Sequence, residues 1–318
     1  MLLISVVLVC LMGKYPLSVN DIFNIIKGEA SVLDKAVFFK IRLPRVFFCA
    51  IAGAVIAVCG NAYRELFGNP LASPDVLGAS SGAGVGTAIA LILGMTSFRV
   101  QAMGLCFSII AVIMTVALCS LMGRAKATYL VLSGIVIKAL CDSAIMVFKY
   151  MSESQGKLAA LEYRLMGSFQ NVRNIHIIQI LPVCAVCLLL LYLLRWRIRI
   201  LSLGDDEAIA LGMNAGRLRV VCIILATLPV AATVSVTGVI SWAGLIVPHA
   251  VSFLCPGDFK DNFLTCVVAG AVFMIWTDTA ARTITSTEIP ISILTSFMGA
   301  VLLGAFLIYR KRRGKEDE

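Results

Sequence analysis

Residues 220–257 read VVCIILATLPVAATVSVTGVISWAGLIVPHAVSFLCPG, a run of 38 positions without Asp, Glu, Lys or Arg. The hydrocarbon core of a bilayer is about 30 Å thick, and a helix needs about 20 apolar residues to cross it. The run is therefore long enough for two crossings. Gly238, near its centre, is a natural place for the chain to turn, because glycine adopts backbone conformations that other residues avoid. This stretch predicts two consecutive transmembrane helices.

The composition of the whole chain indicates the same surroundings. Of its 318 residues, 60% are hydrophobic and only 14% are charged, and the mean hydropathy is +0.96. A soluble domain has about 45–50% apolar and about 25% charged residues. A chain this apolar lies mostly in lipid, which excludes a secreted enzyme, a nucleic-acid-binding protein and any module with a large water-exposed core.

Further charge-free runs mark the other expected crossings. They cover residues 46–63, 76–98, 100–123, 127–137, 174–194, 262–277 and 289–309. The run that starts at 127 continues past Lys138 and Asp142 to about residue 148, and residues 1–13 add a short apolar segment. The sequence therefore predicts an all-α polytopic membrane protein with about ten transmembrane helices in one domain over residues 1–318.

Basic residues in the short connections indicate the orientation, because Lys and Arg are enriched in cytoplasmic loops. Under a ten-helix count, one side collects Arg124, Lys126, Arg195, Arg197, Arg199, Arg217, Arg219 and the basic tail at 310–315. That side is expected to be the cytoplasm, with both termini facing it. We interpret the tail as the flank of the last helix rather than as a nucleic-acid-binding segment.

Glycines recur at four-residue spacing in the stretch GASSGAGVG at 78–86. Gly78, Gly82 and Gly86 therefore share a helix face, where small residues let transmembrane helices approach closely. A phosphate-binding loop is the other interpretation of a glycine-rich stretch, but the sequence has no G-x-x-x-x-G-K-[ST] motif. We expect helix packing here, and no binding of ATP through such a loop.

Several short motifs follow one another along the chain. They are RLPR at 42–45, GNPLASPDVLG at 68–78, EYRLMGS at 162–168, LGDDEAIALG at 203–212, GLIVPH at 244–249, DTAAR at 278–282 and EIP at 288–290. Their order and spacing resemble the permease family of ABC importers for iron–siderophore, haem and cobalamin complexes. The resemblance covers essentially the whole chain.

The resemblance implies a single permease domain of the type II ABC importer class in a bacterial or archaeal plasma membrane. It also implies a second permease copy or a paralogue, two cytoplasmic ABC ATPase subunits that carry ATP and Mg²⁺, and an extracytoplasmic substrate-binding protein or lipoprotein. The chain itself would hold no cofactor or metal and no catalytic residue. The implied cargo is a metal chelate, and a ferric siderophore is favoured over haem or cobalamin.

The longest polar stretch on the expected cytoplasmic side is the loop at about 200–219. Acids alternate there with small apolar residues between glycines, a pattern typical of a short helix with a glycine at each end. In the family, the matching loop couples the permease to its ATPase, whereas an ordinary solvated connection is the alternative. The residues expected to couple are Leu203, Gly204, Asp205, Asp206, Glu207, Ala208, Leu211 and Gly212.

Arginines mark the expected outer side. Arg42 and Arg45 are three residues apart and so share a helix face, and Arg282 falls at the outer end of a later helix. Exposed arginines at a rim can orient an acidic partner. In the family, arginines at matching positions receive acidic residues of the binding protein, and we expect the same here. Snorkelling to lipid headgroups is the alternative.

Two pairs of opposite charge, Lys138/Asp142 and Asp278/Arg282, lie inside expected helices at a spacing of four residues. Ionisable residues inside a membrane are costly and suggest function, and an ion-coupled secondary transporter would need such groups. That transporter is the alternative function from a different class. Neutralisation within each pair is the simpler interpretation and is preferred.

Three further residues are expected, with the glycines at 78–86, to serve in packing or in the wall of the transport pathway. These are Asn69, Pro70 and Pro248. His249 follows Pro248 near a helix end, and we expect it to be structural rather than a ligand for haem or iron.

Overall fold

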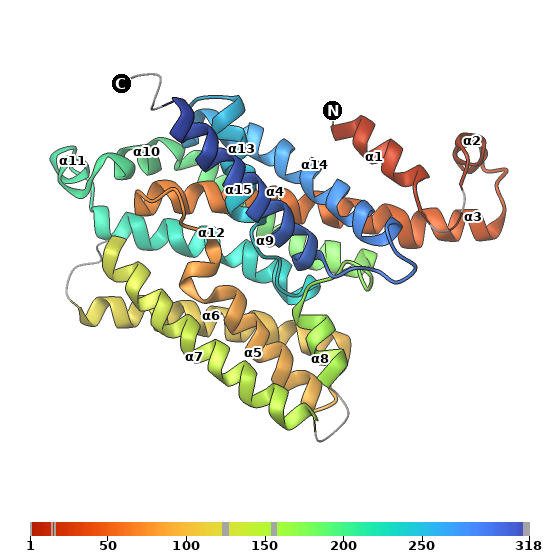
Figure 1. The fold of residues 1–318 in the computed structure, drawn as a ribbon, viewed down its shortest axis with the longest axis horizontal. Coiled ribbons are helices and arrows are strands. Elements are labelled where there is room, and N and C mark those ends of the chain that lie inside the picture. The colour runs from red at the N-terminus through yellow and green to blue at the C-terminus, as the bar shows by residue number, and fades with distance from the viewer. Residues whose placement is uncertain (1, 14, 16, 123–126, 154–157, 314–318) are drawn as a thin grey trace.

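The computed structural model describes residues 2–13, 15, 17–122, 127–153 and 158–313, with side chains up to residue 305 in the last helix. These residues form helices and connections, with no strand among them. Helix α4 runs through the middle of the bundle, with α10 and α11 at one end and α2 and α3 at the other (Figure 1). The predicted all-α class is confirmed.

Ten apolar helices in the described part of the chain correspond to the ten expected ones. Six are long enough to cross a bilayer by length and composition, and four are shorter. The long group contains α4 (Leu43–Phe67), α6 (Ser97–Leu121), α7 (Ala127–Glu153), α9 (Asn174–Leu193), α12 (Ala215–Thr237) and α14 (Phe259–Thr283). The shorter group contains α1 (Leu2–Leu11), α5 (Ala79–Ile92), α13 (Ala243–Leu254) and α15 (Ile291–Arg313), the last counted over Ile291–Ala305 only. How many of them span the membrane stays a prediction.

Shorter helices that the hydropathy pattern did not predict fill the connections. They are α2 (Val19–Lys27), α3 (Val32–Ala36), the π-helical η1 (Val37–Arg42), the 3₁₀-helical η2 (Pro74–Leu77), α8 (Leu158–Leu165), α10 (Arg195–Leu203) and α11 (Asp205–Ala210). Helices α3, η1 and α4 follow one another without a break over 36 residues, Val32–Phe67. The helix predicted from residue 46 therefore begins earlier than its charge-free run.

The 220–257 run forms two helices, as predicted. Helix α12 ends at Thr237, and Gly238 has a positive φ of 81° that favours glycine. A Cβ on Gly238 would lie 2.1 Å from the Arg164 carbonyl oxygen, so the turn packs directly on the end of α8. The Ser168 amide also donates to the Thr237 carbonyl at 2.7 Å. The break between the two helices is thus a packed junction rather than a loose loop.

Close backbone approaches hold α4 against its neighbours. A Cβ on Gly53 would lie 2.1 Å from the carbonyl oxygen of Gly270 in α14, and one on Gly60 would lie 1.8 Å from that of Gly244 in α13. Without a hydrophobic drive between helices in lipid, such contacts between small residues supply the packing. Helix α4 is accordingly the buried centre of the fold.

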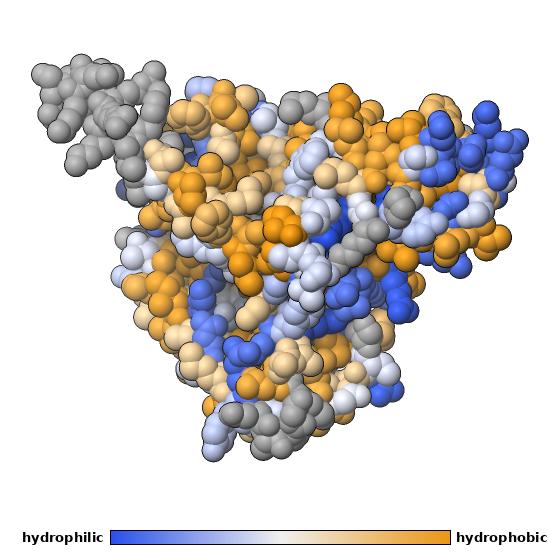
Figure 2. Space-filling model, turned by 45° about the vertical axis from the view of Figure 1, so that its right-hand side comes forward, coloured by the Kyte–Doolittle hydropathy of each residue, from blue (hydrophilic) through white to orange (hydrophobic). Residues whose placement is uncertain are grey.

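The outer surface of the bundle is largely apolar. Figure 2 shows large hydrophobic areas on one face, with hydrophilic residues at the upper right and in a band from the centre toward the lower left. Helix α7 exposes Ile135, Leu140 and Met146, and α15 exposes Phe297 and Val301. Exposed apolar side chains in such number are suited to lipid or to another apolar helix.

Candidate functional site

The segment 203–212 forms a short helix between two glycines, as the sequence predicts. Gly204, with φ of 142°, separates α10 from α11, and Gly212, with φ of 75°, follows the end of α11. The Met213 amide donates to the Ala208 carbonyl at 3.0 Å and closes the helix end. Both glycines hold conformations that side-chain-bearing residues rarely adopt, so they fix where this helix starts and stops.

This segment presents a mixed surface to the outside. Leu203, Ile209 and Leu211 are each more than half exposed, whereas Ala208 is fully buried beneath them. Asp206 and Glu207 are exposed in the first turn, where the helix dipole favours acids. An exposed apolar patch with charged residues beside it is suited to contact another protein. Leu203, Ile209, Leu211, Asp206 and Glu207 form this exposed surface, which we name the coupling face after the role that the sequence predicts for it.

Ion pairs attach α10 and α11 to the ends of three long helices. Asp205 pairs with Arg219 of α12 at 2.7 Å, and Arg219 Nε donates to the Leu66 carbonyl of α4 at 3.0 Å. Arg199 of α10 pairs with Asp258 at 2.8 Å, just before α14, and lies 3.9 Å from Glu65 of α4. The coupling face is therefore joined to the bundle by charged contacts rather than by the chain alone.

At the opposite end of α4, a buried charge cluster surrounds Arg45. Its guanidinium binds both oxygens of Asp278 at 2.8–3.2 Å and pairs with Glu288 at 2.8 Å. Arg282 lies 3.8 Å from the same Asp278 carboxylate. The cluster joins α4, α14 and the connection that leads into α15.

Helix α1 covers this cluster. The guanidinium of Arg42 donates to the carbonyls of Cys10 and Tyr15, and Arg282 Nη2 donates to the carbonyl of Val9 at 3.1 Å. Arginines thus bind carbonyls in the last turn of α1 and just after it, a region where helix carbonyls commonly lack a partner in their own helix. A cavity of about 200 Å³ lies beside Gly13 and Tyr15 in this region.

The expectation of an exposed arginine rim is wrong for this structure. Arg42, Arg45 and Arg282 are only 4%, 8% and 9% exposed. The reason is that their partners come from α1 and from residues 278–288, which the local spacing of the arginines does not reveal. Their role in docking stays a prediction, and it would require the end of α1 to move.

Just outside this cluster, Tyr15 connects the α1–α2 segment to α3. Its hydroxyl donates to Asp34 Oδ1 at 2.8 Å. This hydrogen bond to a carboxylate raises the pKa of Tyr15 above its ordinary value. The contact is exposed, unlike the arginine cluster.

The two intramembrane charge pairs differ. Asp278 and Arg282 do meet, as expected, although Arg45 shares the carboxylate. Within the described residues, no ion pair joins Lys138 to Asp142, so the expected neutralisation of this pair is not found. Asp142 instead accepts a hydrogen bond from Ser81 of α5 at 2.6 Å.

The glycines at 78–86 lie where α5 meets its neighbours. A Cβ on Gly82 would lie 2.7 Å from the Phe107 carbonyl oxygen, and one on Gly86 would lie 2.2 Å from that of Met103, both in α6. Gly78 has φ of 76° and approaches the backbone of Lys138 in α7. Helix α5 is thus held close to both α6 and α7.

The other packing or pathway candidates are not brought together. Asn69 and Pro70 lie in an exposed turn after α4, where the Asn69 side chain accepts from the Leu71 amide at 2.9 Å. Pro248 is buried inside α13. These residues therefore do not form one site with the glycines in this conformation.

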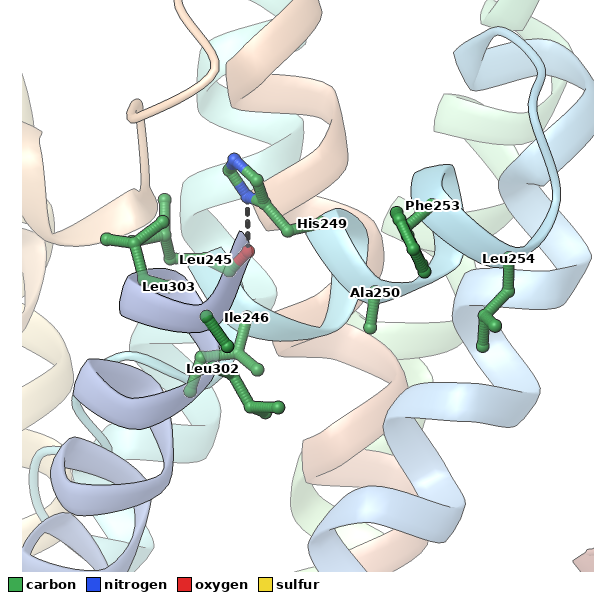
Figure 3. A pocket seen from close by; sticks show the side chains of 9 residues that line it. Leu245, Ile246, His249, Ala250, Phe253, Leu254, Leu302 and Leu303 are labelled. Carbon is green, nitrogen blue, oxygen red and sulfur yellow. Dashed lines mark hydrogen bonds between the residues drawn. The ribbon is translucent and has the colours of Figure 1, made fainter. Parts of the chain in front are cut away.

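An apolar pocket of about 400 Å³ lies between α13 and α15 (Figure 3). Leu245, Phe253, Leu302 and other apolar side chains line it, together with His249. The His249 Nδ1–H donates to the Leu245 carbonyl of its own helix at 2.8 Å. Among the described residues, no three His, Cys, Asp or Glu side chains gather to hold a metal ion.

Part of the basic pattern used for orientation is not described. Residues 123–126, which include Arg124 and Lys126, and residues 314–318 lie outside the described residues, as do the side chains of 306–313. Arg195, Arg197, Arg199, Arg217 and Arg219 do lie at the end of the bundle that carries α10 and the start of α12.

Comparison with known proteins identifies the family. The sequence profile described as the FecCD transport family matches residues 1–310. A molybdate import system permease protein of Haemophilus influenzae is 32% identical over 100% of this chain and 96% of its own length. A Helicobacter pylori permease named for iron chelatin transport is 32% identical over 87% of this chain and 83% of its own length. A hemin transport system permease protein of Yersinia pestis is 33% identical over 95% of this chain and 90% of its own length.

A solved structure supports the same assignment. A metal-chelate-type ABC transporter in an inward-facing conformation superimposes with a TM-score of 0.87 at 30% identity, covering 97% of this chain and 96% of that one. This chain is therefore an integral membrane permease rather than an enzyme, and it belongs to the FecCD transport family.

Proposed function

We propose that this chain is the permease subunit of an ATP-driven importer that takes up a ferric siderophore. The observation that carries the proposal is the match of the family profile to residues 1–310, combined with an exposed helix between glycines at 203–212. The relative named for iron chelatin transport and the metal-chelate-type structure favour an iron chelate as the cargo.

The geometry supports a division of work between subunits. The exposed coupling face is the surface proposed to receive a separate cytoplasmic ATPase, which would place both termini of this chain on the cytoplasmic side. The exposed apolar faces of α7 and α15 are proposed to meet lipid and a second permease copy or paralogue. Nucleotide would drive transport by binding two arrangements of the helices with different affinity.

A binding protein is proposed to deliver the cargo at the other end, near Arg42, Arg45 and Arg282. These arginines already have carboxylate or carbonyl partners inside the chain. Docking through them therefore requires an exchange of partners, in which acidic groups of the binding protein replace Glu288 or the carbonyls of α1. Such an exchange is reversible because both states keep the guanidinium groups paired.

A molybdate importer is the second candidate. It is favoured by the Haemophilus influenzae relative, whose similarity extends over 100% of this chain. Haem, suggested by the Yersinia pestis relative, and cobalamin are further cargoes to distinguish. An ion-coupled secondary transporter is less favoured, because Asp142 is hydrogen-bonded to Ser81 and Asp278 is paired with two arginines.

Reconstitution of the permease with its ATPase and binding protein in liposomes tests the proposal. Uptake is measured for a radioiron-labelled ferric hydroxamate siderophore, haemin, cobalamin and molybdate, with ATP or with an imposed proton gradient. We expect ATP-dependent uptake of the ferric siderophore and no uptake with the gradient alone. Uptake of molybdate alone would identify molybdate, rather than a ferric siderophore, as the cargo. Gradient-driven uptake without ATP would contradict the proposal that this permease belongs to an ATP-driven importer.

A further inference from the structure

A buried arginine, Arg219, connects the short helix α11 to α4 at the centre of the fold. Arg219 is 3% exposed and lies in the first two turns of α12. Its Nη2 pairs with Asp205 of α11 at 2.7 Å, and its Nε donates to the Leu66 carbonyl near the end of α4 at 3.0 Å. One planar guanidinium thus touches α11 and α4 while its own backbone belongs to α12.

We propose that Arg219 is the positioning residue that transmits movement of α11 to α4. The inference rests on the proposed function, because it assumes that an ATPase moves α11. We call the contacts of Asp205, Arg219 and Leu66 the Arg219 bridge.

The energetics of burial make the bridge a firm connection. Removing one partner from a buried ion pair is strongly destabilising, because it leaves an uncompensated charge inside the protein. A displacement of Asp205 that left Arg219 behind would carry that cost. The lower-energy response is for Arg219, and with it the end of α4, to follow the movement.

Arginine is suited to this task and lysine is not. The guanidinium has donors in a fixed planar arrangement, so one side chain can hold a carboxylate and a carbonyl that lie on different helices. A lysine ammonium is a point charge on a flexible stem and would keep the charge without fixing the geometry. The bridge therefore predicts different behaviour for these two basic residues.

Helix α4 gives the bridge a long range. The helix has 25 residues and therefore extends over about 37 Å. It is tightly packed at Gly53 and Gly60, and its other end carries Arg45 in the charge cluster. A displacement received at Leu66 is thus applied to the helix that also holds the opposite end of the molecule together.

The neighbouring Arg199 provides a contrast. Its side chain is 34% exposed, and it pairs with Asp258, which is equally exposed. Ion pairs between exposed groups contribute little, because water screens the attraction. Arg199 therefore holds α10 in place only weakly. The arginine side chain of the Arg219 bridge is 4% exposed, although Asp205 is 32% exposed, so the bridge is the contact that can transmit a movement.

The test measures cargo molecules imported per ATP hydrolysed by the reconstituted complex, with the radioiron-labelled ferric hydroxamate as probe. Arg219→Gln removes the bridge, and Asp205→Asn weakens it from the side of α11, where the Asp205 side chain is 32% exposed. Arg197→Gln is the matched control, because it makes the same substitution at an exposed arginine of α10.

We expect Arg219→Gln and Asp205→Asn each to lower imported cargo per ATP by about tenfold, within the range typical of coupling between sites. Arg219→Lys should give an intermediate value, and Arg197→Gln should match the wild type. If Arg219→Gln fails to insert, Asp205→Asn decides the question. An unchanged ratio in Asp205→Asn, with uptake and hydrolysis falling together, means a purely structural role and overturns the inference. A wild-type complex without ATP-dependent uptake overturns the proposed function itself.

Discussion

The two ends of α4 differ in the charges that they expose, although each end also holds a buried arginine, Arg45 or Arg219. At one end, Arg45, Asp278 and Glu288 are paired with one another beneath α1, and the arginine is only 8% exposed. At the other end, Asp206 and Glu207 face outward beside the exposed Leu211. A charge inside a protein needs a partner there, whereas an exposed one is solvated by water. The comparison indicates that the coupling end is open to a partner, while the arginine end must rearrange first.

The largest effect is expected from breaking the buried cluster. Arg45→Met removes the ion pairs that Arg45 makes with Glu288 and Asp278, so the free energy of unfolding should fall by about 3–5 kcal/mol. Thermal unfolding of the purified permease in detergent measures this. Glu288→Gln serves as the milder comparison, because Asp278 still pairs with Arg45. A melting temperature unchanged by Arg45→Met would show that the cluster does not hold this end together.

A smaller effect is expected from releasing α1. Arg42→Met removes charged hydrogen bonds to the carbonyls of Cys10 and Tyr15, each worth about 1.5–3 kcal/mol. Opening of the α1 end should therefore become about tenfold or more easier, and the buried Cys10 should react faster with a maleimide. Peptide mass spectrometry measures the labelling, with the exposed Cys106 as the internal reference. Equal labelling of Cys10 in both proteins would contradict the role of Arg42.

The exposed ion pair at the coupling end should matter less. Arg199→Gln removes the contacts to Asp258 and Glu65, and the free energy of unfolding should change by only about 0–1 kcal/mol. The difference from the wild type should shrink further at high salt, where exposed charges are screened. Denaturation at low and high salt measures both effects. A loss as large as that of Arg45→Met would erase the distinction between the two ends.

The smallest effect concerns the exposed contact beside the arginine cluster. Asp34→Asn removes the carboxylate that raises the pKa of Tyr15, so this pKa should fall toward its ordinary value. Ultraviolet titration, with Tyr15→Phe to identify the signal, measures the shift. No shift between Asp34→Asn and the wild type would mean that this hydrogen bond does not form in solution.

The sequence predicts the long helices well, because a continuous apolar run has one stable structure in lipid. The run at 220–257 divides at Gly238 as expected, since the glycine has the positive φ that a turn requires. The short helices α2, α8 and α10 were not predicted, because each is shorter than a span and contains charged residues. The short helix at 205–210 was predicted, because acids and flanking glycines mark its ends.

The site was only partly predictable. The arginines at 42, 45 and 282 were found, but their burial was not predicted. Arg45 is paired with Glu288, 243 residues away, and Arg282 binds the carbonyl of Val9, 273 residues away, and such distant partners leave no local sequence pattern. The glycine contacts of α4 were also missed. The seven-residue spacing of Gly53 and Gly60, which places both near one side of the helix, was the available signal.

The most direct test of the account changes the coupling face itself. Glu207→Arg reverses an exposed charge of α11, and Lys149→Gln, near the far end of α7, is the matched control. Uptake of the radioiron-labelled ferric hydroxamate is measured in liposomes that contain ATP, together with the amount of inserted permease. The account predicts that uptake by Glu207→Arg falls to background while insertion and the control remain normal. Normal uptake by Glu207→Arg would contradict the claim that this permease is driven through residues 203–212.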